Sequence, residues 1–326
     1  MNKLKHHLIP LLIGLIFAIA IWQIAETLIA DFWSKTCLSI FGSSFVEMPT
    51  MDKNGIPMRY YPSAGKVYDP EFIAYESSRF YKTRIEEPRK NAFLLYSKWL
   101  EEHLDENSNI PHNYDYPKAH LKKPWFSSAS HSATMLALTE RAGNLRSPET
   151  FIKARKMLYT LQPEKGNFSF YEKKGGIWFQ EFPTEPYSLS GMLKTLVNLS
   201  EYYKLVDDSL SWELFQQGVI ALQAKLPELA KKNLLDDKYH YKNKRSEHLE
   251  LVALLEEVNS ATPDSVFTPF IQKYQAKSKQ FVLFQFFCPF QPGRILGFLI
   301  GWAVLYLLAY LFFKPLRTGE HEGERS

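Results

Sequence analysis

Apolar residues at spacings of three and four run through most of the middle of the chain and predict a mainly helical fold. The pattern occurs in four consecutive pairs of segments: 72–81 with 91–104, 128–142 with 149–161, 188–205 with 211–229, and 246–258 with 262–277. The pairs follow one another without exact sequence repetition. Successive helical hairpins of this kind are typical of an α/α barrel (toroid), so we expect about four hairpins in that arrangement.

Two stretches interrupt the helical pattern. Aromatic residues lie on both sides of KKGG at 173–176, which predicts a β-hairpin inserted between the second and third helical pairs. The stretch 54–70, ahead of the first pair, is rich in turn residues and aromatics. We expect it to form a loop or short strands.

Both ends of the chain carry uncharged apolar runs, at 8–25 and 295–313. Roughly 20 apolar residues cross a bilayer as a helix, so the chain is predicted to have two transmembrane helices. Lysines and arginines outside both runs place the two termini in the cytoplasm by the positive-inside rule. The expected parts are a cytoplasmic N-terminus (1–7), a transmembrane helix (8–30), a periplasmic or extracellular domain (31–290), a second transmembrane helix (294–313) and a cytoplasmic tail (314–326). The first run could instead be a signal peptide, because Ala18–Ala20 fits a cleavage pattern.

Charge and cysteine content narrow the partners and the compartment. The formal net charge of +4 is spread along the chain, which gives no reason to expect a nucleic-acid partner. Cys37 follows the first predicted span and Cys288 precedes the second, each on the outer side of the membrane. In an oxidising compartment they could form a disulfide, and the alternative is two unrelated buried thiols.

Three ordered stretches, GIPMRYYPSAGKVYDPEFIAY, NYDYPKAHLKKPWFSSASHSA and GGIWFQEFPTEPYSLSGML, resemble the C-terminal domain of the D-glucuronyl C5-epimerases. The resemblance covers roughly 54–277. It implies an α/α barrel, epimerisation of the glucuronic acid units of a heparosan-like polysaccharide or glycolipid, no organic cofactor, and a homodimer.

The chain departs from the family at several positions. The family pattern W-Y-E-E-Y-P corresponds to WFQEFP at 178–183. The second glutamate of that pattern, which acts at the substrate in the family, matches Glu181, but the tyrosine after it is Phe182. A second family tyrosine aligns with Lys244, and His131 stands where a glutamine is usual. These departures leave the source of the second proton open.

Inversion at C5 of a uronate needs two proton-transfer groups and a means to stabilise an enolate-like intermediate. Glu181 is the predicted base, and its aromatic neighbours would raise its pKa by desolvation. The alternative is that Glu181 has a structural role, as a polar residue beside a turn, and takes no part in catalysis. For the second group the candidates are Tyr239, Tyr241, His240 and His131, although a helical histidine such as His131 is often structural.

Aromatic and basic residues supply candidates for substrate binding. Those of the kind that stack on sugars or pair with a carboxylate are Tyr114, Tyr116, Trp125, Trp178, Arg59, Lys123 and Arg245. No metal-ligand spacing is found in the sequence. Two other functions stay open: a uronate lyase, which begins with the same proton abstraction, and a non-catalytic protein that binds glycan or scaffolds a membrane assembly.

Overall fold

The structure is a computed structural model that describes residues 8–21, 35–36, 38–40, 42, 47–83, 87–184, 187–229, 244–262, 266–278 and 292–313. The chain divides into two compact units. One is Ser34–Ser278, and the other combines Met1–Trp33 with Lys279–Ser326. Cys37, Cys288, Tyr239, His240 and Tyr241 lie outside the described residues.

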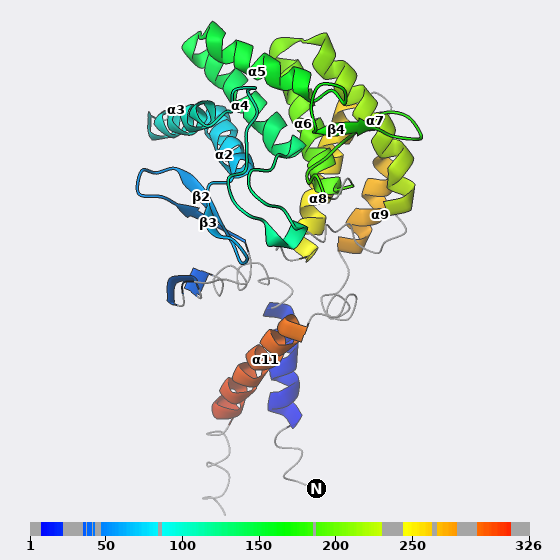
Figure 1. Ribbon diagram of the computed structural model, residues 1–326. Coiled ribbons are helices and arrows are strands. Elements are labelled where there is room, and N and C mark those ends of the chain that lie inside the picture. The colour runs from blue at the N-terminus through cyan, green and yellow to red at the C-terminus, as the bar shows by residue number, and fades with distance from the viewer. Residues whose placement is uncertain are drawn as a thin grey trace, which may run out of the picture. The chain divides into compact units, whose positions relative to one another are not determined.

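The larger unit is mainly helical, as predicted, and its helices form four antiparallel pairs (Figure 1). The pairs are α2 (Pro70–Lys82) with α3 (Glu87–Glu102), α4 (Ser128–Leu145) with α5 (Pro148–Thr160), α6 (Leu189–Val206) with α7 (Ser209–Leu229), and α8 (Lys244–Ala261) with α9 (Thr268–Ser278). The first helix of each pair packs against the first helix of the next, in the order α2, α4, α6, α8. These four inner helices therefore run in the same direction and begin at the same end of the unit.

The last helix of the larger unit starts later than the sequence predicts. The apolar pattern predicts a start at Thr262, whereas α9 begins at Thr268. Thr262 instead ends the preceding helix, because its backbone N–H and its hydroxyl both donate to the carbonyl oxygen of Asn259, at 3.2 and 2.8 Å.

Side-chain caps fix where the inner helices begin. Asp69 accepts a hydrogen bond from the backbone N–H of Glu71 at 3.0 Å at the start of α2. Ser127 caps α4, and Ser188 caps α6 by accepting from the N–H of Gly191 at 3.2 Å. Such caps satisfy N–H groups that have no partner within the helix. Three cap residues are thus gathered at one end of the inner helices.

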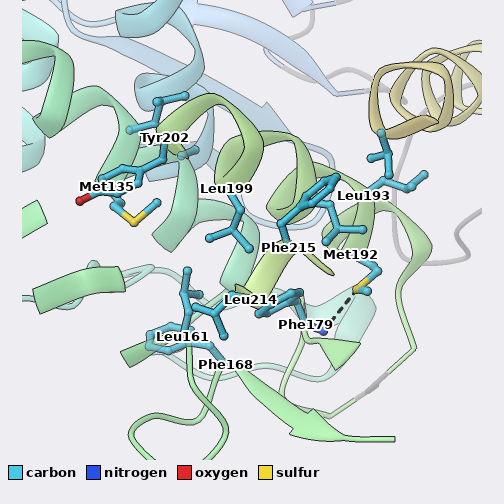
Figure 2. Close-up of a cluster of buried hydrophobic side chains, with 14 of the residues drawn as sticks. Met135, Leu161, Phe168, Phe179, Met192, Leu193, Leu199, Tyr202, Leu214 and Phe215 are labelled. Carbon is cyan, nitrogen blue, oxygen red and sulfur yellow. Dashed lines mark hydrogen bonds between the residues drawn. The ribbon is translucent and has the colours of Figure 1, made fainter. Parts of the chain in front are cut away.

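A large apolar core fills the space between the inner and outer helices (Figure 2). Helix α4 is buried over nearly its whole length, as expected for an inner helix with neighbours on both sides. The fully buried Phe179, Tyr202 and Phe215 belong to the same cluster. The helices that carry the site therefore rest on a continuous apolar support.

The expected β-hairpin is present as β4 (Ser169–Tyr171) and β5 (Ile177–Phe179), paired antiparallel. Its turn approaches α7 so closely that a Cβ on Gly176 would lie 2.3 Å from the carbonyl oxygen of Gln217. The stretch before α2 forms a three-stranded antiparallel sheet of β1 (Met48–Met51), β2 (Pro57–Tyr61) and β3 (Gly65–Val67). Both small sheets lead directly into residues of the candidate site.

In the smaller unit, the helix at 8–21 packs against α11 (Pro292–Phe313). Ala18 and Phe298 are buried together, and the indole N–H of Trp302 donates to the carbonyl oxygen of Leu11 at 3.3 Å. Across the described ranges, no helix combines the length and the hydrophobicity needed to span a bilayer. The predicted span at 8–30 continues into residues outside those ranges.

Candidate functional site

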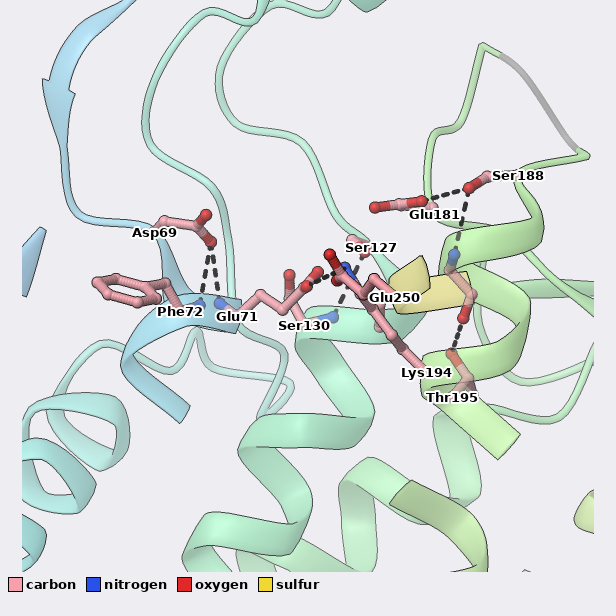
Figure 3. Close-up of polar contacts among 12 residues, drawn as sticks. Asp69, Glu71, Phe72, Ser127, Ser130, Glu181, Ser188, Lys194, Thr195 and Glu250 are labelled. Atoms are coloured by element: carbon pink, nitrogen blue, oxygen red, sulfur yellow. Dashed lines mark hydrogen bonds and ion pairs between the residues drawn. The ribbon is translucent and has the colours of Figure 1, made fainter. Parts of the chain in front are cut away.

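Glu181 lies just after β5, where the chain turns toward the start of α6. Its side chain is 3% exposed, and the hydroxyl of Ser188 donates a hydrogen bond to its Oε2 (Figure 3). A Cβ on Gly191 would lie 2.3 Å from the Cβ of Glu181, so only glycine permits this approach. The hydroxyl donor and the N-terminus of α6 both favour a negative charge at this position.

Glu181 lines a small pocket at the end where the inner helices begin. The other lining residues come from β2, the start of α2, the segment 112–127 and the residue after Glu181: Arg59, Tyr61, Asp69, Glu71, His112, Tyr114, Tyr116, Trp125, Ser127 and Phe182. Their side chains leave a cavity of about 20 Å³, room for about one water molecule. A sugar ring can enter only if some of these side chains move.

Four residues predicted to bind substrate, Arg59, Tyr114, Tyr116 and Trp125, line this pocket together with Glu181. Phe182 also belongs to the pocket wall. Its ring stacks on that of Tyr116, with centroids 5.9 Å apart and an interplanar angle of 18°. Phe182 therefore contributes a ring without a hydroxyl to the aromatic wall of the pocket.

Other predicted residues lie elsewhere. His131 is fully buried, with its Nε2 3.0 Å from the carbonyl oxygen of Met157 and 2.8 Å from the hydroxyl of Thr160. Burial lowers its pKa to about 4, and its contacts join α4 to α5 rather than to Glu181. Trp178 is fully buried in the core and Lys123 is on the surface, so neither lines the pocket. The side chain of Arg245 is outside the described residues.

Sequence reasoning missed an ion pair in the pocket wall. The guanidinium of Arg59 lies 3.2 Å from Oδ2 of Asp69, and the hydroxyl of Tyr61 donates to the same oxygen at 2.5 Å. Burial pushes the pKa of Asp69 upward, but the Arg59 charge and its hydrogen bonds hold that pKa below its usual value. Burial and the Asp69 charge raise the pKa of Tyr61 well above 10. Asp69 is therefore ionised and Tyr61 protonated near neutral pH.

Sequence reasoning also missed His112, whose contacts come from residues 114–130 and are made across a loop. Its ring stacks on Trp125 with centroids 3.8 Å apart. Its Nδ1 lies 3.2 Å from the hydroxyl of Tyr114, and its Nε2 lies 2.6 Å from the hydroxyl of Ser130. Burial lowers the pKa of His112 to about 4 against the opposing charges of Asp69 and Glu181, and burial raises the pKa of Tyr114 well above 10. The pair thus consists of a neutral imidazole beside a protonated phenol.

Lys194 on α6 supplies a partly buried positive charge that no sequence signal indicated. Its Nζ lies 2.6 Å from Oε1 of Glu71 on α2 and 4.0 Å from Oε1 of Glu250 on α8 (Figure 3). Burial lowers the pKa of Lys194, but the charges of Glu71, Glu181 and Glu250 outweigh this effect and raise that pKa above its ordinary value. This lysine therefore stays protonated and joins three inner helices close to Glu181.

The site thus combines carboxylates, protonated phenols, a neutral imidazole and two cations. A carboxylate can accept a proton, a neutral phenol can donate one, and Arg59 and Lys194 can stabilise negative charge. Within the described part of the chain, no group of three or more histidine, cysteine, aspartate or glutamate side chains is arranged to hold a metal ion.

Two solved structures are similar in part. Cellobiose 2-epimerase from Spirochaeta thermophila DSM 6192 shares 11% sequence identity over 64% of this chain and 57% of that enzyme, with a TM-score of 0.46. An unsaturated glucuronyl hydrolase specific for heparin shares 10% identity over 84% of this chain and 81% of that chain, with a TM-score of 0.35. The chain therefore spans little more than half the length of the cellobiose epimerase. A search of curated proteins gave no match.

A family comparison covers the part of the chain that carries Glu181, although Arg59, Asp69 and Glu71 lie outside it. The model described as D-glucuronyl C5-epimerase C-terminus matches residues 104–234, which is less than half of the chain. The matched range includes His112, Tyr114, Glu181 and Lys194. The resemblance predicted from the sequence is therefore confirmed: residues 104–234 match the C-terminal domain of the D-glucuronyl C5-epimerases.

Proposed function

We propose that this protein is a carbohydrate epimerase that inverts C5 of glucuronic acid units in a uronate-containing polysaccharide, with Glu181 as the base. The observation that carries the proposal is the position of Glu181: a buried carboxylate, within the matched segment, facing protonated phenols and a cation in one pocket.

The proposed reaction begins when an oxygen of Glu181 takes the proton from C5. The electron pair left on carbon moves into the adjacent carboxylate and gives an enediolate, whose charge Arg59 and Lys194 stabilise. A phenol on the opposite face then returns a proton to C5. Proton exchange with solvent restores both the carboxylate and the phenol.

Tyr114 is the strongest candidate for the second proton. It lines the pocket, its pKa is raised, and its hydroxyl adjoins the neutral His112. Tyr61 is less suited, because its hydroxyl already donates to Asp69 at 2.5 Å. Tyr114 would thus do the work that Phe182, which has no hydroxyl, cannot do.

The small cavity of about 20 Å³ favours a second candidate, a non-catalytic protein that binds glycan outside this pocket. A hexuronate needs far more room than one water molecule. The epimerase proposal therefore requires that the pocket wall opens when substrate binds.

The proposal includes the setting of the enzyme. The four hairpins would belong to an α/α toroid held at a membrane by two spans, with both termini in the cytoplasm and the main domain outside it. The uncharged runs near both ends, their basic flanks and the packing of the helix at 8–21 on α11 support this topology.

The test is incubation of the full chain with a heparosan-type polymer in deuterated water. Deuterium at C5 of both glucuronate and its epimer supports the epimerase, an unsaturated product supports a lyase, and binding without either supports the non-catalytic protein. For Glu181→Gln we expect exchange to fall by about 10²- to 10⁴-fold, the usual contribution of a general base. Unchanged exchange would remove Glu181 from the mechanism.

Tyr114→Phe separates the two proton transfers. It should leave deuterium exchange at C5 of glucuronate measurable while inversion falls strongly, because only the opposite face loses its donor. Tyr116→Phe is the matched control, since Tyr116 lines the same pocket. Equal inversion by the two variants would contradict the role of Tyr114.

A further inference from the structure

A second, larger cavity lies beside the segment that carries the candidate site. It has a volume of about 540 Å³ and is lined by Glu106, Asn107, Asn109, Phe126, Lys156, Tyr159, Thr160, Lys165, Gly166, Asn167 and Phe168. This size is within the range of about 300–1,000 Å³ that is common for ligand sites. None of these residues lines the pocket of Glu181.

The two cavities share one segment of chain. Trp125 and Ser127 line the pocket of Glu181, whereas Phe126 between them lines the larger cavity. Ser127 is extended, with φ −135° and ψ 134°, and successive side chains of extended backbone point to opposite sides. The larger cavity also contains the last residues of α5, which ends at the end of the unit where α4 begins. Both cavities therefore open at the same end of the helices.

One wall of the larger cavity is a hydrogen-bonded turn. Asp105 accepts hydrogen bonds through Oδ1 from the backbone N–H groups of Asn107 and Asn109, at 2.9 and 2.7 Å, and the Asn109 amide nitrogen lies 3.3 Å from its Oδ2. These bonds leave the side-chain oxygen of Asn109 buried and without a hydrogen-bond partner in the structure. Because this oxygen is shielded from solvent, the groups that can meet a ligand are the exposed ones in the lining.

The other residues that line the larger cavity have side chains suited to binding an acidic sugar. Tyr159 is 46% exposed and presents a ring on which a sugar can stack. Asn107 and Asn167 add exposed amides, and Lys156 and Lys165 add two exposed positive charges against the single carboxylate of Glu106. We propose that this cavity, the outer site, binds a further unit of an acidic saccharide whose carboxylate or sulfate pairs with Lys156 and Lys165.

The identity of the polymer in this proposal rests on the proposed function, but binding at the outer site does not require catalysis. One chain that occupied both cavities would cross the segment 125–127. The outer site would then hold the polymer beside the pocket in which one unit reacts.

The test is binding of a heparosan-type octasaccharide to the full chain at about 50 mM salt. We expect Lys156→Ala with Lys165→Ala to weaken binding by about fivefold to tenfold, as two exposed ion pairs would. Lys98→Ala with Lys204→Ala removes the same charge from lysines that are 60% and 59% exposed on α3 and α6, and it should leave binding within about twofold. Tyr159→Ala should also weaken octasaccharide binding, and a neutral octasaccharide of N-acetylglucosamine should bind more weakly than the acidic one.

Several results would overturn the outer site: no octasaccharide binding by the unaltered chain, equal losses in the two lysine pairs, or equal affinity for the acidic and neutral chains. Failure of the proposed function is a different result. If no C5 exchange occurs but the Lys156 and Lys165 pair still controls binding, the outer site stands without the epimerase. If exchange occurs and the lysine pair has no effect on octasaccharide binding, the epimerase stands without the outer site.

Discussion

At the scale of single residues, the position of Glu181 depends on a residue that has no side chain. We expect Gly191→Ala to lower the free energy of unfolding by about 1–3 kcal/mol, because the new methyl group would overlap the Cβ of Glu181, 2.3 Å away. It should also lower C5 exchange by displacing the carboxylate. Thermal or denaturant unfolding and the exchange assay measure the two effects.

Gly143→Ala is the matched control on α4, because nothing lies within 4 Å of the added methyl group. It should raise the free energy of unfolding by about 0.5–1 kcal/mol, since glycine weakens a helix interior relative to alanine. If both variants changed stability in the same direction, the packing account of Gly191 would be wrong.

The two buried histidines predict how stability depends on pH. Burial lowers the pKa of His112 and of His131 in the folded state to about 4, from an ordinary histidine value of 6.5. The stability that the folded state owes to these neutral histidines is fully present above pH 6.5. As the pH falls toward 4 the free energy of unfolding decreases, because the unfolded chain then binds protons that the folded chain does not. The expected slope is about 1.4 kcal/mol per pH unit for each histidine.

His131→Gln checks this slope, because His131 lies away from the pocket of Glu181. The variant should reduce the dependence of the unfolding free energy on pH between 6.5 and 4 by the share of one histidine, and C5 exchange per folded molecule should not change. Denaturant unfolding at several pH values measures the slope. An unaltered slope would mean that His131 titrates normally in the folded protein.

Of the site residues, the sequence identified Glu181 through the resemblance, and Tyr114, Tyr116, Trp125 and Arg59 through their chemistry. It did not identify His112, Asp69 or Lys194. The partner of Lys194 is far away in the sequence, since Glu71 is 123 positions from it. Asp69 and His112 meet partners that are closer in the sequence, such as Tyr61 and Ser130, but across turns and loops rather than along one element. Periodicity and local motifs describe neighbours along one element, so they do not indicate which side chains meet at the ends of several helices.

At the scale of single elements, the start of α6 joins helix stability to the site. Ser188 accepts from the N–H of Gly191 and donates to Glu181. Ser188→Ala should lower the unfolding free energy by about 0.5–2 kcal/mol through loss of the cap and should also lower C5 exchange.

Ser147→Ala on α5 removes a comparable cap, in which Ser147 accepts from the N–H of Thr150 at 3.3 Å. Its stability loss should be similar, but exchange per folded molecule should stay unchanged. Unfolding and exchange measured on both variants would separate the two roles of Ser188, and equal exchange rates would exclude a contribution of its hydroxyl to Glu181.

The helical pairs and the β-hairpin were predictable because each is encoded locally, by apolar spacing, caps and turn residues. The order α2, α4, α6, α8 of the inner helices required the structure, since hairpins of similar amphipathic pattern can pack in more than one way. The apolar pattern did not predict the late start of α9. Thr262 forms hydrogen bonds to Asn259 that end α8, and apolar spacing does not indicate such bonds.

At the scale of the whole molecule, the packing of the terminal helices gives a prediction about how the chain ends are joined. A Cβ on Gly14 would lie 2.9 Å from the backbone nitrogen of Tyr306. Gly14→Val should therefore separate the two helices, whereas Gly301→Val, with nothing within 4 Å of its Cβ position, should not.

Disulfide cross-linking between Ala18→Cys and Phe298→Cys measures this packing, with Cys37 and Cys288 replaced by serine. Cross-linking should fall with Gly14→Val and persist with Gly301→Val.

For the proposed topology, reporter fusions after Trp33 and at the C-terminus should report opposite sides of the membrane. Reporters on one side would contradict the two-span proposal.

The close contact between Glu181 and Gly191 has a consequence for recognising further proteins with this site. A glutamate near aromatics is a common pattern, but the contacts described above also require a hydroxyl seven positions later, at Ser188, and a glycine three positions after that. We therefore expect the spacing E-x6-S-x2-G to distinguish chains that hold a buried carboxylate at a helix start from chains in which a glutamate merely follows a hairpin.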